Sequence, residues 1–152
     1  MIIPVSARQI IEQFPLGFVA TVTKDGAPSV SPKGTFLVLG NEAIAFAEIR
    51  SPQTMANLAI RAEAEVNFID IWKRKGVRIA GSVEVLERGS DGFAGFLPKW
   101  KASFPALAWR FNAIVTIAAE RVKLMTTPPY DDGATEDEMI ALYKAKFAEI
   151  YP

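Results

Sequence analysis

One short stretch of the sequence combines residue types that bind anions. It runs from Glu48 to Thr54, after an expected strand and at the start of an expected helix. Ser51 is a favoured helix N-cap, and Pro52 is favoured at the first helical position. The first turn of a helix offers unpaired N–H groups and the positive end of the helix dipole. With side-chain donors from Arg50, Ser51, Gln53 and Thr54, the stretch predicts a phosphate site; the alternative is a capped helix with a solvated arginine.

A second stretch, from Ser29 to Thr35, is typical of a strand that leaves backbone groups unpaired. Its prolines, Pro32 among them, cannot donate hydrogen bonds to a neighbouring strand. Gly34 permits close approach of a flat heteroaromatic ring, and Lys33 would place a positive charge beside an anionic ring. The alternative is a bulged edge strand that proline and lysine protect from aggregation.

The composition excludes several kinds of chemistry. The 152 residues include no histidine and no cysteine, so a Ser-His-Asp triad, a thiolate nucleophile, disulfides and histidine or cysteine metal ligands are ruled out. We expect no metal site and identify no catalytic residue. Glutamate, aspartate, lysine, tyrosine or a bound cofactor would have to carry any reaction. Because 17 basic residues balance 17 acidic ones, we expect neither nucleic acid nor membrane as a partner.

The length and the distribution of apolar residues predict a single domain over residues 1–152. The first residues lack a basic stretch followed by an apolar segment, so we expect no signal peptide. No apolar run reaches the roughly 18 residues that a membrane span needs. The cytoplasm is therefore the expected location.

The hydrophobic pattern predicts mostly strands, with helices only in the gaps between them. Asp25-Gly26 indicates a two-residue hairpin, and Lys75-Gly76 indicates a second turn. Serine and threonine at 6 and 135, each followed three residues later by glutamine or glutamate, predict two capping boxes. The expected strands cover residues 17–23, 28–33, 35–39, 43–49, 65–73, 77–86 and 113–125. The expected helices cover residues 6–14, 51–62 (with Met55, Leu58 and Ala59 on one face) and 135–150, with a helical region within 91–104.

This pattern predicts a mainly β protein. Six or seven mostly antiparallel strands at close spacing favour a closed or nearly closed barrel with flanking helices. Neither a G-x-G-x-x-G loop nor a G-x-x-x-x-G-K-[ST] loop is present, which disfavours the common nucleotide-binding folds.

Several short motifs occur in a fixed order along the chain. They are Phe18-Val19-Ala20-Thr21-Val22, Asp25-Gly26, Val30-Ser31-Pro32-Lys33, Thr54-x-x-Asn57-Leu58 and Glu65-Val66-Asn67-Phe68. This order resembles the FMN-binding split barrel of the pyridoxamine 5′-phosphate oxidase-like family, in its branch of small flavin-binding proteins. The resemblance covers residues 6 to 125, and the last helix is an addition.

The resemblance implies a split β-barrel that binds FMN between two subunits of a homodimer. It also implies a small-molecule electron donor or acceptor. By position, the flavin ring would lie against Ser31, Pro32, Lys33 and Gly34. The phosphate would bind Ser51, Gln53 and Thr54, with Arg50 beside them.

The sequence departs from the family pattern in two places. Many relatives have Ser-Arg-Lys where this chain has Pro52-Gln53-Thr54. The arginine-rich C-terminal segment that holds the substrate of true pyridoxamine phosphate oxidases is absent, so we do not expect that reaction. The expected function is an FMN-dependent oxidoreductase. The alternatives are a non-catalytic carrier or sensor of flavin or of the deazaflavin F420, and a ligand-free dimerisation barrel.

Two further features have structural interpretations. Trp72, Trp100 and Trp109 are expected in the core or at a dimer interface, with Trp109 the best placed to approach a flavin from the partner. The basic run Lys73-Arg74-Lys75 is interpreted as a solvated hairpin rather than as a site for a nucleotide tail.

Overall fold

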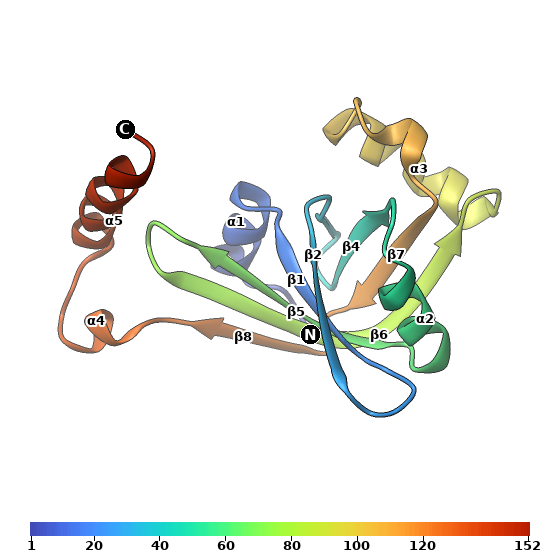
Figure 1. Cartoon of the computed structure of the whole chain (residues 1–152), viewed down its shortest axis with the longest axis horizontal. Helices are drawn as coiled ribbons and strands as arrows, with labels where there is room; N and C mark the ends of the chain where they lie inside the picture. The colour runs from blue at the N-terminus through green and yellow to red at the C-terminus, as the bar shows by residue number, and fades with distance from the viewer.

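A computed structural model describes all residues, 1–152, and shows an antiparallel sheet with helices around it (Figure 1). The strands are β1 (Gly17–Val22), β2 (Pro28–Lys33), β3 (Leu37–Leu39), β4 (Ala43–Glu48), β5 (Glu63–Asp70), β6 (Lys75–Glu87), β7 (Ala113–Ala118) and β8 (Arg121–Met125). The sheet order is β2-β1-β5-β6-β7-β4-β3, and β8 also pairs with β6. Since β2 and β3 do not pair with each other, the barrel stays open. The expected mainly β class and split barrel are confirmed, with eight strands.

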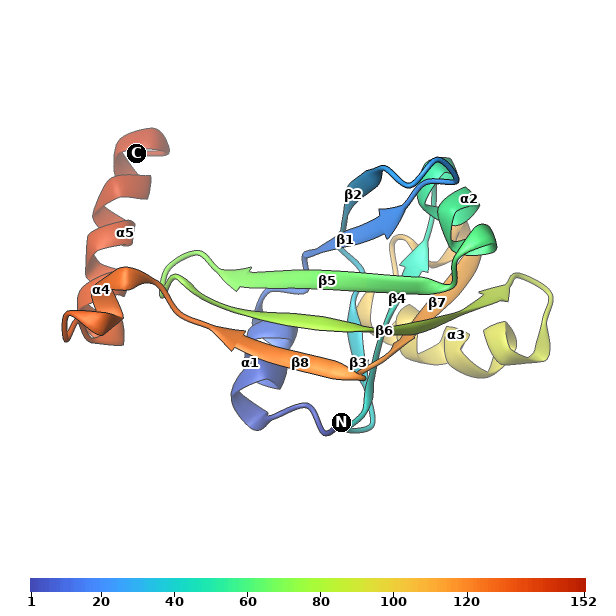
Figure 2. The same cartoon turned by 90° about the horizontal axis from the view of Figure 1, so that it is seen from below.

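Five α-helices and one 3₁₀ turn flank the sheet. They are α1 (Val5–Gln13), α2 (Pro52–Ile60), α3 (Asp91–Ser103), η1 (Ala108–Arg110), α4 (Pro128–Asp131) and α5 (Glu136–Ile150). Figures 1 and 2 show α5 at one end of the molecule, with α2 and α3 at the other. None of these helices is both long enough and apolar enough to cross a lipid bilayer.

The longest strand, β6, joins the two halves of the barrel. It pairs with β5 on one side, and on the other side first with β8 and then with β7. The single strand expected over residues 113–125 is interrupted: β7 and β8 follow β6 in the same direction, but their register shifts by one residue and Ala119 and Glu120 lie between them. At that point a Cβ on Gly81 would lie 1.8 Å from the carbonyl oxygen of Ala118, so the close approach requires glycine.

Two groups of buried side chains hold the sheet and helices together. Inside the barrel, Phe36 packs against Phe46 and Phe68 with ring centroids 5.3 and 4.8 Å apart. A second group lies between α3 and the sheet and includes the fully buried Trp100. The indole N–H of Trp100 donates a hydrogen bond of 2.8 Å to the backbone oxygen of Thr35. The expectation that Trp100 packs in the core is confirmed.

The helix ends and faces agree with the sequence only in part. At α5 the capping box is confirmed, because Thr135 and Glu138 exchange hydrogen bonds of 3.2 and 3.1 Å. The capping box at Ser6 is wrong, since α1 begins one residue earlier and Pro4 is its N-cap. The expected apolar face of α2 is wrong at Ala59, which is exposed. The buried residues of that helix are Thr54, Asn57 and Leu58.

The two hairpin turns differ from the sequence prediction. The β1–β2 turn is one residue longer than expected, since Thr23 N–H donates to the oxygen of Ala27 across three residues, and only Gly26 has a positive φ. The β5 strand does not continue to Lys73. It ends at Asp70, whose carboxylate accepts hydrogen bonds from the backbone N–H groups of the second and third residues after it. The turn at Lys75-Gly76 is thereby displaced to residues 71–74.

Candidate functional site

The strand β2 turns two of its predicted ring-binding residues to the inside of the barrel. In the β1–β2 register, Ser31 lies opposite Val19 and Lys33 lies opposite Gly17. Val19 and Gly17 are buried, and residues opposite each other in a sheet share a face. Ser31 and Lys33 therefore lie on the inner face, which α2 also covers from the end of β4 (Figure 2).

The other two predicted ring residues do not join them. Pro32 lies opposite Phe18, and both are exposed on the outer face of the same ribbon. Gly34 is also exposed, and no heavy atom would meet a Cβ placed there. The structure thus brings Ser31 and Lys33 together and separates them from Pro32.

Lys33 is the cation of this inner face. Its ammonium donates a hydrogen bond of 2.5 Å to the hydroxyl of Ser31. Partial burial lowers the pKa of Lys33, while the nearby carboxylate of Glu48 acts in the opposite direction. This coupling links β2 to the end of β4, where the predicted phosphate site begins.

We call residues Glu48 to Thr54 the β4–α2 corner. Glu48 is the last residue of β4, and only 6% of its surface is exposed. Its carboxylate accepts hydrogen bonds from the backbone N–H of Ser51 at 2.6 Å and from the Ser51 hydroxyl at 3.2 Å. Ser51 is the N-cap residue of α2, as expected, but its side chain makes no capping hydrogen bond and binds Glu48 instead. Pro52 does occupy the first helical position, as expected.

The remaining corner residues have three different environments. Gln53 donates a hydrogen bond of 2.7 Å to Asn57, which in turn donates one of 2.9 Å to the hydroxyl of Thr21, so this chain ties α2 to β1. Thr54 is 3% exposed and lies on the buried face of the helix. Arg50 is exposed and takes part in none of the ion pairs of the chain. Arg50 is thus the free cation of the corner.

A buried framework fixes the corner relative to β2. The hydroxyl of Thr35 donates to the oxygen of Ala47 at 2.8 Å and accepts from the Ala47 N–H at 3.0 Å. Trp100 holds the backbone oxygen of Thr35 from the other side. Since Thr35 follows Lys33 closely and Ala47 precedes Glu48, these bonds set the spacing of the two charged groups.

The donor groups of this region fit a flavin phosphate in part. Lys33 on the inner face, Arg50 at the corner and the first-turn N–H groups of α2 all favour an anion. The carboxylate of Glu48 opposes one; Glu48 lies in the predicted stretch, but its residue type gave it no role there. Its only signal is a carboxylate at the end of a strand, three residues before Ser51.

The corner is closely packed in the single chain, because Glu48, Ser51 and Thr54 are each no more than 9% exposed. Hollows of about 300, 380 and 410 Å³ open elsewhere, and neither predicted stretch lines any of them. Trp109 lies on the last of these hollows and is 76% exposed, so it does not pack in the core of its own chain.

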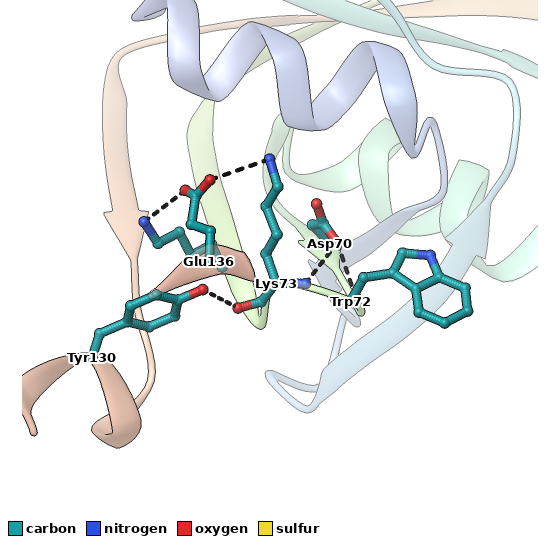
Figure 3. Close-up of polar contacts among 6 residues, drawn as sticks. Asp70, Trp72, Lys73, Tyr130 and Glu136 are labelled. Carbon is teal, nitrogen blue, oxygen red and sulfur yellow. Dashed lines mark hydrogen bonds and ion pairs between the residues drawn. The ribbon is translucent and has the colours of Figure 1, made fainter. Parts of the chain in front are cut away.

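The basic run between β5 and β6 is bound to the C-terminal helices rather than solvated (Figure 3). The carboxylate of Glu136 pairs with Lys73 at 3.5 Å and with Lys75 at 2.9 Å. The hydroxyl of Tyr130 donates to the backbone oxygen of Lys73 at 2.6 Å, and burial raises the pKa of Tyr130. The guanidinium of Arg74 lies 3.8 Å from the ring centre of Tyr143. The interpretation of this run as a solvated hairpin is therefore wrong.

Comparison with known proteins decides the family. The sequence model of the pyridoxamine 5′-phosphate oxidase family matches residues 3–126. The chain belongs to this family. The resemblance inferred from the sequence motifs is thus confirmed, and α4 and α5 lie beyond the part of the chain that matches the family. No curated protein matches the chain.

Solved structures share the family fold at low identity. HupZ of Group A Streptococcus is 22% identical over 82% of this chain and 95% of its own, with a TM-score of 0.70. A putative pyridoxamine 5′-phosphate oxidase of Lactobacillus delbrueckii is 22% identical over 80% and 93%, with a TM-score of 0.67. An FMN-binding protein of Syntrophomonas wolfei is 14% identical over 80% and 84%, with a TM-score of 0.64. At these identities the likeness shows the fold alone.

Proposed function

We propose that the chain is a cytoplasmic FMN-binding protein that uses the flavin as an oxidoreductase with a small-molecule electron donor or acceptor. One observation carries this proposal. Ser31 and Lys33 of β2 face the same side of the sheet as α2, and Lys33 is coupled electrostatically to the β4–α2 corner. A ring site on β2 would thereby lie next to an anion site at the corner. The family fold, which an FMN-binding protein shares, supports this arrangement.

The residues of the chain would bind and orient the cofactor. Bound FMN supplies the hydride or electron transfer itself. Lys33, whose ammonium donates a hydrogen bond to the Ser31 hydroxyl, would hold positive charge beside the ring. Arg50 and the backbone N–H groups of the first turn of α2 would hold the phosphate. The donors of Ser51 would reach it only by leaving Glu48.

A second copy of the chain would complete the site. The outer face of the β1–β2 ribbon exposes Phe18, Val30 and Pro32, which form an apolar surface on an edge strand. None of the three hollows described above lies at the corner, so one chain alone does not enclose a flavin there. We therefore propose a homodimer that covers this ribbon, with Trp109 of η1 available to approach the flavin of the other copy.

Titration with FMN tests the proposal directly. The purified protein is expected to bind FMN and to show the visible absorbance of a bound flavin. Arg50→Glu should weaken FMN binding about tenfold, because it replaces an attraction to the phosphate with a repulsion. Arg61→Glu at the other end of α2 is the matched control and should leave the affinity unchanged. Equal affinity in both variants would place the phosphate elsewhere.

The same preparation separates the alternatives. Turnover with NADH or NADPH and an acceptor would identify an enzyme, whereas binding without turnover would identify a carrier or sensor. Titration with F420 tests the deazaflavin alternative. A dimer that binds none of these cofactors would be a ligand-free dimerisation barrel.

A further inference from the structure

We propose that Glu48 is a specificity-determining residue whose carboxylate competes with the flavin phosphate for the donors of Ser51. The chain would then recognise flavins mainly by their ring, and the phosphate would add little affinity. This inference rests on the proposed function, because it concerns the same site.

The hydrogen bonds of Ser51 support this competition. Its backbone N–H and its hydroxyl are two of the donors nearest to the start of α2, and both bind one oxygen of Glu48, at 2.6 and 3.2 Å. The first of these distances is that of a strong, charge-assisted hydrogen bond. The corner therefore already contains an anion that belongs to the chain, and a phosphate must displace it to use these donors.

The burial of Glu48 strengthens the repulsion between its carboxylate and a phosphate. Only 6% of the residue is exposed, so water screens it weakly. It forms no ion pair that would neutralise it, and Lys33 acts on it only from a longer distance. A phosphate placed at Ser51 would meet a like charge, which is unfavourable at a desolvated site.

The cations that would offset this repulsion are few. The first three residues of α2, Pro52, Gln53 and Thr54, include no cation, and the side chain of Gln53 is already bonded to Asn57. Arg50 is the one free cation of the corner. With one anion and one cation, the corner does not favour flavins that carry a phosphate over those that do not.

Parallel titrations with FMN and riboflavin, which differ only in the phosphate, test the inference. The wild-type protein is expected to bind the two flavins with affinities within about threefold of each other. Glu48→Gln keeps an acceptor for Ser51 but removes the charge, and it should raise the affinity for FMN about tenfold relative to riboflavin. Glu84→Gln, which removes an exposed carboxylate of β6, is the matched control and should leave the ratio unchanged.

Ser51→Ala provides a second test that does not depend on how Glu48→Gln folds. In the wild-type background the Ser51 hydroxyl binds Glu48 and not the phosphate. Its removal should therefore change the ratio of FMN to riboflavin affinity by no more than about twofold. In the Glu48→Gln background the hydroxyl is available to the phosphate, and its loss should lower the ratio about threefold or more.

The outcomes distinguish this inference from the proposed function. If neither flavin binds to any variant, the proposed function is wrong and the inference falls with it. If both flavins bind but Glu48→Gln leaves their ratio unchanged, only the inference is wrong. A wild-type protein that prefers FMN over riboflavin by about a hundredfold, or a Ser51→Ala variant that loses FMN alone, would also overturn it.

Discussion

The β4–α2 corner and the turn between β5 and β6 contain similar residues but use them in different ways. At the turn, Lys73 and Lys75 are both paired with the carboxylate of Glu136 (Figure 3). Arg74 packs on Tyr143. At the corner, the carboxylate of Glu48 accepts hydrogen bonds only from its neighbour Ser51, and the arginine is free. The turn has three cations, and each of them contacts α5. The corner has one cation, Arg50, and it forms no ion pair within the chain.

The comparison shows that a basic run indicates an anion site only when no other part of the chain neutralises it. The cations of the turn are engaged by Glu136 and Tyr143 of α5, a helix that lies beyond the part of the chain that matches the family. The corner lies inside that part. The C-terminal segment outside the family match thus binds the basic run Lys73-Arg74-Lys75, which is the most obvious cluster of charge in the sequence.

The largest expected effect concerns the framework of the corner. Trp100→Ala should reduce the free energy of unfolding by about 3–5 kcal/mol, because it opens a cavity in the buried group under α3 and removes the donor to Thr35. Urea unfolding measures this loss. Trp109→Ala at an exposed position is the control and should change stability by about 0.5 kcal/mol or less. Similar losses in both variants would contradict the role given to Trp100.

The next effect concerns the charge of Lys33. Burial lowers its pKa, so it loses its proton at a lower pH than an ordinary lysine. An anionic flavin binds the protonated form better, and the affinity should therefore fall about tenfold as pH rises through this pKa. FMN titrations across the alkaline range measure the step. Lys33→Met should remove it, whereas Lys24→Met in the β1–β2 turn should not; a step that persists in Lys33→Met would assign it to another group.

A smaller effect is expected where α5 meets the turn. Tyr143→Ala removes the ring on which Arg74 packs and should weaken the docking of α5 by about 1 kcal/mol. Amide hydrogen exchange along residues 136–150 should become faster, while flavin affinity stays unchanged. Leu142→Ala, at an exposed position of the same helix, serves as the control. Altered flavin binding in Tyr143→Ala would show that the two regions are coupled.

The smallest effect is the response of the turn to acid. The hydrogen bond from Lys75 and the charge of Lys73 hold the pKa of Glu136 below its usual range. A carboxyl whose pKa is lower in the folded state stabilises that state above its unfolded pKa, and this contribution is lost as pH falls through the folded pKa. These ion pairs are partly exposed, so the loss should be less than about 1 kcal/mol.

Hydrogen exchange of α5, corrected for the intrinsic pH dependence of exchange, measures this loss. Glu136→Gln should show weaker docking at neutral pH and no further change on acidification. An acid response that is the same in Glu136→Gln as in the wild type would locate the titrating group elsewhere.

The sequence predicted the features of the fold that depend on local patterns. The edge position of β2 follows from its prolines, and the capping box of α5 follows from Thr135 and Glu138. The break between β7 and β8 could not be predicted, because it depends on the approach of Ala118 to Gly81 across two strands. The early end of β5 depends in the same way on a side-chain contact, that of Asp70 with the backbone of the turn.

The candidate site was predictable in its residue types but not in its contacts. Alternation along a strand already implies that Ser31 and Lys33 share a face that Pro32 does not, although which face is buried depends on the pairing with β1. The role of Glu48 depends on a turn that brings Ser51 back to the end of β4. Burial and that turn give an ordinary glutamate its importance, and neither is visible in the spacing of residues.

The length of β6 separates the two ends of the molecule and acts as a spacer between them. It begins at Lys75, which forms an ion pair with Glu136 of α5. It ends at Glu87, which lies opposite Ala113 of β7, and Ala113 lies opposite Glu48 of the corner. Thirteen residues of extended chain span roughly 40 Å. An α5 helix docked as described here is therefore too distant to touch the corner of its own chain. Any α5 residue found beside a bound flavin would belong to a neighbouring molecule, and the C-terminal helix would then report how the copies assemble.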